Sequence, residues 1–229
     1  MDLLVLTSMA VRPVLADLAP LLPSVRCEAA GGVEVARRIR DGASADLAVL
    51  AADALAALHA EGLVGTPRPL WDSETVAAVP ADAPPAALDT VDDLRALLTA
   101  ARAVAHSTGP SGTALRALLD RLGLRGRVHL VQAPPGTPAG SLLADGRADL
   151  AFQQHSELAG LPGVRLLGPL PGDTAITSTF AAAVLATAPH PGPARALLDR
   201  LASDAAAATA LARGMRPHRR RQRLDAARR

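Results

Sequence analysis

The sequence predicts an α/β fold of two lobes, in which each lobe is a mainly parallel sheet flanked by helices and two crossing strands form a hinge. Three observations lead to this prediction. Short apolar strands alternate with helical stretches, short polar turns connect them, and the pattern starts again after a proline-rich stretch at residues 80–85. A strand followed by a turn and a helix favours parallel pairing, because the helix carries the chain back along the sheet.

The first lobe is expected to begin with the apolar run at residues 3–6. Ser8 is a candidate cap for the helix that follows, and Asp53 is a candidate cap for a later one. We expect strands at 3–6, 24–27, 46–50 and 75–79, and helices at 9–18, 33–40 and 53–60.

The second lobe repeats the pattern. Thr90 begins its first helix, with Asp93 in the position that a capping box normally gives to Glu or Gln. We expect helices at 90–101, 111–122 and 139–145, and strands at 103–106, 128–132, 149–152 and 164–167.

The alternating stretch 174–186 is long enough to cross back to the first lobe, where two Ala-rich helices, at about 194–202 and 204–213, end the fold at Gly214. We therefore assign residues 1–78 and 180–216 to lobe I, residues 79–179 to lobe II, and residues 217–229 to a basic, disordered tail.

The net charge of +2 conceals an uneven distribution. All 24 basic residues are Arg, and eight of them lie in the last 17 residues beside one acid, Asp225. The first 212 residues hold 16 Arg against 21 acids, a net charge of −5. A nucleic-acid-binding domain carries its positive charge on the fold, and this chain has one Trp, two Phe and no Tyr for base stacking. We expect no nucleic-acid partner, and we expect removal of residues 218–229 to leave ligand affinity almost unchanged.

The cysteine content and the length of the apolar runs further limit the class of protein to which the chain can belong. One cysteine, Cys27, excludes an intramolecular disulfide and a cysteine-based zinc site, and we expect it to be a small buried hydrophobe. No run of 18 apolar residues exists, so no membrane insertion is expected. The first strand starts close to Met1 without a secretory signal, which predicts a cytoplasmic protein, or a periplasmic one if the start site is misassigned.

Four polar turns follow predicted strands, where open α/β sheets bind their ligands. Each has a structural alternative: a hydroxyl can cap its own helix, a glycine pair can permit a tight turn, and Arg12 can be a solvated helix residue. The turns are Thr7-Ser8-Met9 with Arg12, Gly31-Gly32-Val33, the stretch from His106 to Thr113, and the stretch from Phe152 to Glu157.

The stretch from His106 to Thr113 is the most specific of them, because hydroxyls and backbone amides converge at a helix start and could hold an anion. It is not a nucleotide-binding P-loop, since the chain has no Lys. The histidines lack metal-ligand spacing, so neither a metal nor another cofactor is expected. Glu157 and His106 are candidate bases for proton transfer.

Taken together, the segments resemble the type 2 periplasmic-binding-protein superfamily in its molybdate-binding-protein-like branch, and they are most similar to the sub-branch that contains bacterial aconitate isomerase. The resemblance covers about residues 2–216 and departs from molybdate-binding proteins at Phe152-Gln153-Gln154. It is carried by VLTSMAVRPVL (5–15), GGVEVARRIRDG (31–42), ADLAVLAADAL (45–55), STGPSGTALRALLDRLGL (107–124), GRADLAFQQHSEL (146–158), STFAAAVLATA (178–188) and ARALLDRLASDAAAATALARGM (194–215).

The resemblance implies a ligand site between the lobes. By position, Ser8 and Arg12 would hold one carboxylate, and Gly32 and Val33 would offer backbone N–H groups. A second carboxylate would be held by Ser107, Thr108, Ser111 and Thr113, with Gln153 and Gln154 closing the site.

Two functions stay open. The first is a substrate-binding protein that captures a small anion, a carboxylate or a molybdate-like oxyanion, and presents it to an ABC transporter permease if it is exported. The second is a cytosolic isomerase of the aconitate isomerase type, which moves an allylic proton on an unsaturated polycarboxylate.

Overall fold

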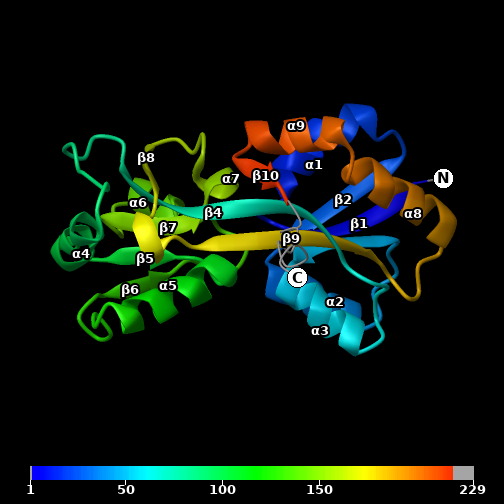
Figure 1. Ribbon diagram of the computed structural model, residues 1–229, viewed down its shortest axis with the longest axis horizontal. Helices are drawn as coiled ribbons and strands as arrows, with labels where there is room; N and C mark the ends of the chain where they lie inside the picture. Colours follow the sequence, from blue (N-terminus) through cyan, green and yellow to red (C-terminus); the bar gives the residue numbers. More distant parts are fainter. Residues whose placement is uncertain (1, 219–229) are drawn as a thin grey trace, which may run out of the picture.

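The computed structural model describes residues 2–218 of the chain. Figure 1 shows two lobes side by side along the longest axis, with two long strands, β4 (Arg68–Pro80) and β9 (Thr177–Val184), running between them. The predicted two-lobed α/β architecture is confirmed. One continuous sheet runs through both lobes in the order β2-β1-β3-β9-β4-β7-β5-β6, with β8 and β10 also paired to β4.

Lobe I contains the N-terminal elements and the last two helices. Its strands are β1 (Leu3–Ser8), β2 (Val25–Ala30), β3 (Leu47–Ala51) and β10 (Met215–Pro217). Its helices are α1 (Arg12–Leu18), η1 (Ala19–Leu21), α2 (Gly32–Arg40), α3 (Ala52–Ala60), α8 (Pro191–Leu201) and α9 (Asp204–Ala212). Strand β1 pairs in parallel with both β2 and β3, as the β-α pattern predicts.

Lobe II is built on the same plan. Its strands are β5 (Val104–His106), β6 (Leu130–Gln132), β7 (Leu150–Gln154) and β8 (Val164–Pro169). Its helices are α4 (Val91–Ala100), α5 (Pro110–Arg121), α6 (Ser141–Ala144), α7 (His155–Leu158) and η2 (Gly172–Thr174). Strand β5 pairs in parallel with β6 and β7. The predicted capping box of α4 is confirmed, since Asp93 N donates to Thr90 Oγ1 at 3.1 Å and Thr90 N donates to Asp93 Oδ2 at 2.9 Å.

Each lobe has an apolar core on both faces of its sheet, because successive side chains of a strand point to opposite faces. In lobe I, Val5 packs with the cluster around Trp71, and Leu6 packs with the cluster around Leu55. In lobe II, the neighbouring residues Phe152 and Ala151 likewise pack into two different apolar clusters, one on each face of the sheet. The strands are therefore held firmly, and their carboxyl ends have fixed positions.

The crossing strands connect the lobes through an antiparallel ladder. Residues 68–74 of β4 pair with β9 in lobe I, and residues 75–80 pair with β7 and β8 in lobe II. Gln154 lies where the pairing of β4 changes from β9 to β7, and its side-chain amide is 2.9 Å from Ser178 Oγ. With its amide oxygen accepting from Ser178, its nitrogen donates to Ser73 Oγ at 2.9 Å and to the backbone carbonyls of Ser73 and Glu74.

Several local predictions were wrong. Ser8 ends β1 and caps no helix: α1 begins at Arg12, where Pro13 suits the first turn because it needs no backbone donor there. Asp53 lies in the first turn of α3, whose N-cap is Ala51. Cys27 is exposed on β2, a strand at the edge of the sheet.

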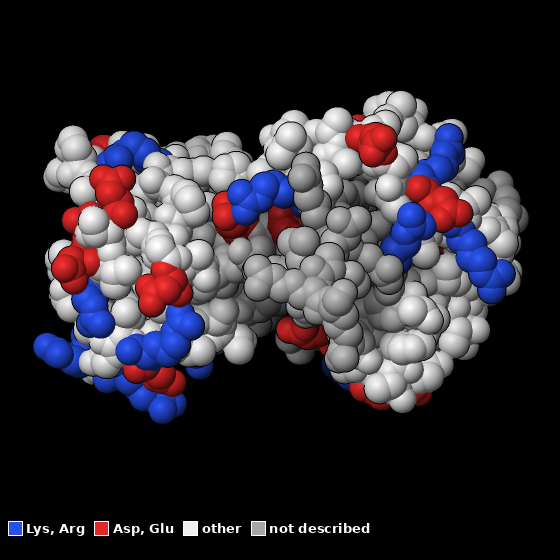
Figure 2. All heavy atoms as spheres, in the orientation of Figure 1, with Lys and Arg blue, Asp and Glu red and all other residues white. Residues whose placement is uncertain are grey.

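The boundary of the predicted tail was also misplaced, because Pro217 belongs to β10 and the backbone N–H of His218 donates to the Leu70 carbonyl at 2.9 Å. The rest of the predicted tail, residues 219–229, lies outside the described residues. On the face in Figure 2, acidic and basic side chains are interspersed over both lobes, and the surface narrows between them.

Candidate functional site in the interlobe cleft

A cavity of about 900 Å³ lies between the lobes. Much of its wall is formed by the segments that follow six strands, which are β1, β2 and β3 from lobe I and β5, β6 and β7 from lobe II. Parallel strands bring their carboxyl ends to one edge, and two such edges face each other here. The lining includes Ser8 to Ala10, Gly31 to Val33, Ala51 to Ala54, Ser107 to Ser111, and Gln153 with Gln154 and Glu157.

Three helices begin at this cavity without a side-chain cap. Helices α2, α3 and α5 have Gly31, Ala51 and Gly109 at their N-caps, and in none of the three does an N-cap side chain accept a hydrogen bond from the first N–H groups of the helix. The first N–H groups of a helix have no partner within the helix and carry its positive dipole end. Uncapped helix starts in a cavity wall therefore suit an anion, which could accept those N–H groups.

Hydroxyl groups supply further donors. Ser8 is only 7% exposed, and its Oγ has no hydrogen-bond partner among the described residues although it lines the cavity. A buried hydroxyl without a partner is costly, so a bound ligand is the natural acceptor for it. In lobe II, Ser107 Oγ and Ser111 Oγ are 3.0 Å apart, and Gly109 N donates to Ser107 Oγ at 3.1 Å, which shapes the turn before α5.

Glu157 is an acid of this wall, and its carboxyl has a raised pKa. Burial raises the pKa of its carboxyl from 4.5 to about 7, against the lowering effects of a hydrogen bond from Gln153 and of the Arg12 charge. Gln153 Nε2 donates to Glu157 Oε1 at 2.7 Å. At neutral pH this carboxyl exists in both forms, so it can accept a proton or donate a hydrogen bond in the cavity.

His106, the other predicted base, does not line the cavity. It is 1% exposed and lies behind the turn, with Nδ1 at 2.9 Å from the Ser107 carbonyl and Nε2 at 3.3 Å from Arg116. Burial, followed by the Arg116 charge, lowers the pKa of its imidazole. Gly112 makes room for this packing, because a Cβ there would lie 2.0 Å from the Ser107 carbonyl oxygen. His106 thus supports the turn from behind.

Most of the predicted ligand-binding residues meet at the cavity. Arg12, in contrast, is exposed on α1 and does not line it, although its charge acts on Glu157. The residues that line it are Ser8, Gly32, Val33, Ser107, Thr108, Ser111, Thr113, Gln153 and Gln154, together with Glu157.

Part of the cavity wall was not predicted from the sequence. The β9 hydroxyls of Thr177, Ser178 and Thr179 line the cavity, and so does His218. The alternation of residues 174–186 signalled a crossing strand, and its run of hydroxyls could have indicated a lining. Nothing in the local pattern pointed to His218, which follows Pro217 at the start of the Arg-rich segment.

Among residues 2–218, no group of three or more His, Cys, Asp or Glu side chains is arranged to hold a metal ion. Within the same residues, every helix is too short or too polar to span a bilayer.

Known proteins with this fold include anion receptors. The periplasmic molybdate-binding protein of Azotobacter vinelandii superposes with a TM-score of 0.78 at 19% identity, covering 93% of this chain and 98% of that one. The sulfate-binding protein of Mycobacterium tuberculosis H37Rv gives a TM-score of 0.72 at 19% identity, covering 95% and 87%. In sequence, an aconitate isomerase from a Pseudomonas species is 32% identical over 187 residues, which is 80% of this chain and 71% of the relative. The family model for bacterial extracellular solute-binding proteins matches residues 3–216, and the chain belongs to that family.

Proposed function

We propose that the protein captures a small anion, a carboxylate or an oxyanion, in the interlobe cleft. The observation that carries the proposal is the convergence of three uncapped helix starts with the unpartnered Ser8 hydroxyl in one cavity. These groups are donors without a full positive charge, and they hold an anion by replacing its water. The family match and the fold shared with molybdate- and sulfate-binding proteins support the same conclusion.

The cleft also suits a transport receptor. Two lobes connected by two strands can close over a ligand by a hinge motion, and a membrane partner can recognise the closed form. We propose an ABC transporter permease as that partner if the protein is exported. Whether it is exported stays a separate proposal, and the reading frame upstream of Met1 tests it: an in-frame signal sequence supports export, and a cytoplasmic protein has none.

Calorimetric titration with molybdate, sulfate, citrate and the two aconitates tests the binding function. We expect at least one anion to bind, and Ser8→Ala to weaken it about 10-fold or more, since a hydrogen bond to a charged group contributes about 1.5–3 kcal/mol. Thr99→Ala, at an exposed hydroxyl of α4, is the matched control and should bind as the wild type does. If none of these anions binds, or if Ser8→Ala binds all of them unchanged, the proposal is wrong.

A second candidate function rests on Glu157. A carboxyl with a pKa of about 7 in a ligand cavity is matched to proton transfer at neutral pH. In an aconitate-type isomerisation, the ionised carboxylate would take a proton from the allylic carbon while the double bond shifts. The protonated acid would then return a proton to the far carbon, which restores the starting state of Glu157. The Pseudomonas aconitate isomerase relative supports this alternative.

Proton NMR of cis- and trans-aconitate in D2O with the purified protein tests the isomerase. Interconversion with deuterium uptake that is lost in Glu157→Gln supports catalysis. The control is Glu34→Gln, which removes an exposed acid that pairs with Arg37 on α2. Tight anion binding without turnover or deuterium uptake leaves the protein as a receptor only.

A further inference from the structure

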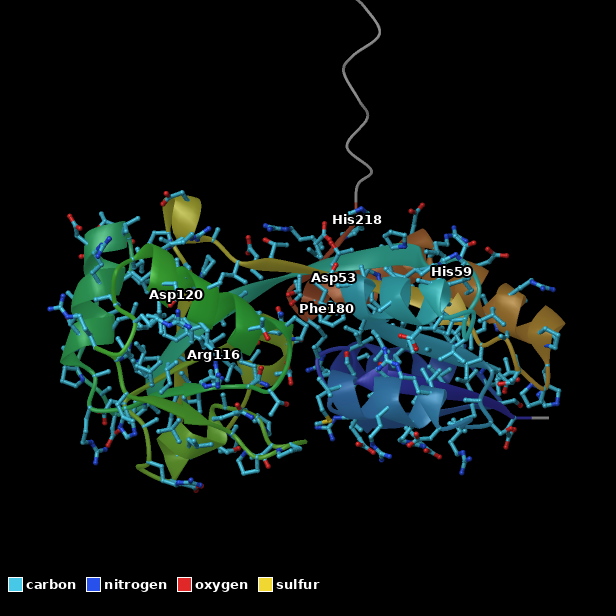
Figure 3. All side chains as sticks on the ribbon, turned by 90° about the horizontal axis from the view of Figure 1, so that it is seen from below. Asp53, His59, Arg116, Asp120, Phe180 and His218 are labelled. Carbon is cyan, nitrogen blue, oxygen red and sulfur yellow. The ribbon has the colours of Figure 1, made fainter. Side chains whose placement is uncertain are left out.

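His218 reaches the cavity by a short extension of the sheet. Strand β10 pairs with β4, so that Met215 lies opposite Ser73 and Pro217 opposite Trp71. The next residue, His218, continues the ladder through its backbone bond to Leu70 and lines the cavity. In Figure 3, His218 appears at the junction of the lobes with Asp53 and Phe180, which line the same cavity.

The imidazole of His218 is held by an acid on the crossing strand. His218 Nδ1 lies 2.9 Å from Asp72 Oδ1, and the same oxygen accepts the Thr179 hydroxyl at 2.7 Å. Asp72 and Thr179 are opposite each other in the β4–β9 ladder, so the acid is fixed by backbone pairing as well. A carboxylate on one ring nitrogen fixes the orientation of the ring and leaves the other for a ligand. Nε2 has no protein partner among the described residues.

The other charged side chains of the cavity wall are less suited to hold an anion. Arg40 is paired with Glu61 at 2.7 Å, and Asp53 and Glu157 are acids. In the imidazolium form both ring nitrogens are donors, so one ring can satisfy Asp72 and a ligand carboxylate together. With its ring protonated, His218 can offer the ligand a charged donor from the hinge side of the cavity, opposite Asp72 and on different elements from the helix starts.

We propose that His218 contacts the bound ligand through Nε2 and gives the cleft a preference for anions with two or more carboxylates. The inference rests on the anion-binding function proposed above. One carboxylate would lie against the helix starts and Ser8, and a second would reach His218. An anion with a single charged centre, such as sulfate, has no second group to offer, so His218 should matter little for it. In this arrangement Asp72 is a positioning residue.

The test compares citrate and trans-aconitate with sulfate and molybdate in the wild type, His218→Gln and Asp72→Asn. We expect the wild type to prefer the polycarboxylates and His218→Gln to lose about 10-fold or more in affinity for them. Sulfate or molybdate affinity, where measurable, should change less than about 2-fold. Asp72→Asn should lose polycarboxylate affinity in the same direction, and thermal unfolding confirms that both variants are folded.

Two controls separate His218 from its surroundings. His129→Gln removes an exposed histidine before β6 that does not line the cavity, and it should change nothing. Because His218 contacts the ligand in this proposal, the earlier expectation that residues 218–229 can be removed without loss of affinity is replaced by one for residues 219–229 alone. A chain ending at His218 should retain the preference, and its loss there would place the preference in residues 219–229 and overturn the proposal.

The outcomes for the two proposals are distinct. If no anion binds the wild type, the binding function itself has failed. If anions bind but a folded His218→Gln retains full polycarboxylate affinity, or if the wild type prefers sulfate or molybdate, only the role of His218 is refuted.

Discussion

Replacing Glu157 by Gln should make the stability of the protein less dependent on pH. The carboxyl has a pKa of about 7 in the fold and about 4.5 in an unfolded chain, so the folded state binds more protons between these values. The stabilisation is fully present below pH 4.5 and is lost as the pH rises through 7. Between pH 5 and pH 8 this amounts to at most about 2.5 kcal/mol in the free energy of unfolding, which is the full effect of a pKa shift from 4.5 to about 7 over that range.

Denaturant unfolding of the wild type and Glu157→Gln at pH 5, 6, 7 and 8 measures this effect. From pH 5 to pH 8, the free energy of unfolding of the wild type should fall by up to about 2.5 kcal/mol relative to that of the variant. For a protein of this size, this corresponds to a relative shift in Tm of roughly 5–10 °C. Other titrating groups, such as His106, cancel in the difference because both proteins contain them. Glu34→Gln should run parallel to the wild type above pH 5, because the Arg37 pair lowers the pKa of that exposed acid. Parallel curves for Glu157→Gln and the wild type would refute the assigned pKa.

Three further predictions test the cleft. Gly112→Ala should destabilise the protein by about 3 kcal/mol in chemical unfolding, because its Cβ would collide with a backbone carbonyl, whereas Gly32→Ala has open space and should change stability by less than 1 kcal/mol. Ser156→Ala should cost about 1–2 kcal/mol in the same assay, since its hydroxyl donates at 2.7 Å to a buried carbonyl across the cleft; an unchanged value would mean that this bond contributes nothing. Arg12→Ala should raise the pKa of Glu157, because it removes a lowering charge, and NMR titration of the carboxyl would contradict this with an unchanged or lower midpoint.

The sequence predicted the β-α units well because the signal for each was local. The stretch from His106 to Thr113 combines strand, turn and helix within a few residues, and the structure forms them where expected. The strand of the apolar run at 3–6 also forms, although the helix after it begins only at Arg12. The polar residues 72–74 gave no such signal, although they lie in the middle of β4. Pairing with β9 and β10 on both sides holds them in the strand, and that information comes from segments far along the chain.

Side-chain direction was the least predictable part of the site. Sequence adjacency could not distinguish His106, which packs behind the turn, from Ser107, which lines the cavity. His218 was not predicted as a site residue for a different reason. It borders the Arg-rich segment, so composition assigned it to the tail, and only the pairing of β10 with β4 brings it to the cleft. The place of His218 therefore depends on contacts distant in sequence, whereas that of His106 depends on which way a side chain points within its own turn.

The Glu157 carboxyl can serve either proposed function, and the two functions differ in what happens to its proton. An anion bound in the cavity favours the protonated form of Glu157, because two negative charges close together repel. Both functions therefore predict that affinity weakens as the pH rises above about 7. In a receptor the acid only has to remain a hydrogen-bond donor, and Gln in its place retains that ability. An isomerase needs the proton to leave and return, which Gln cannot do. A Glu157→Gln variant that binds anions tightly at pH 8 is thus expected in both cases, and deuterium uptake by aconitate in the wild type is the observation that distinguishes them.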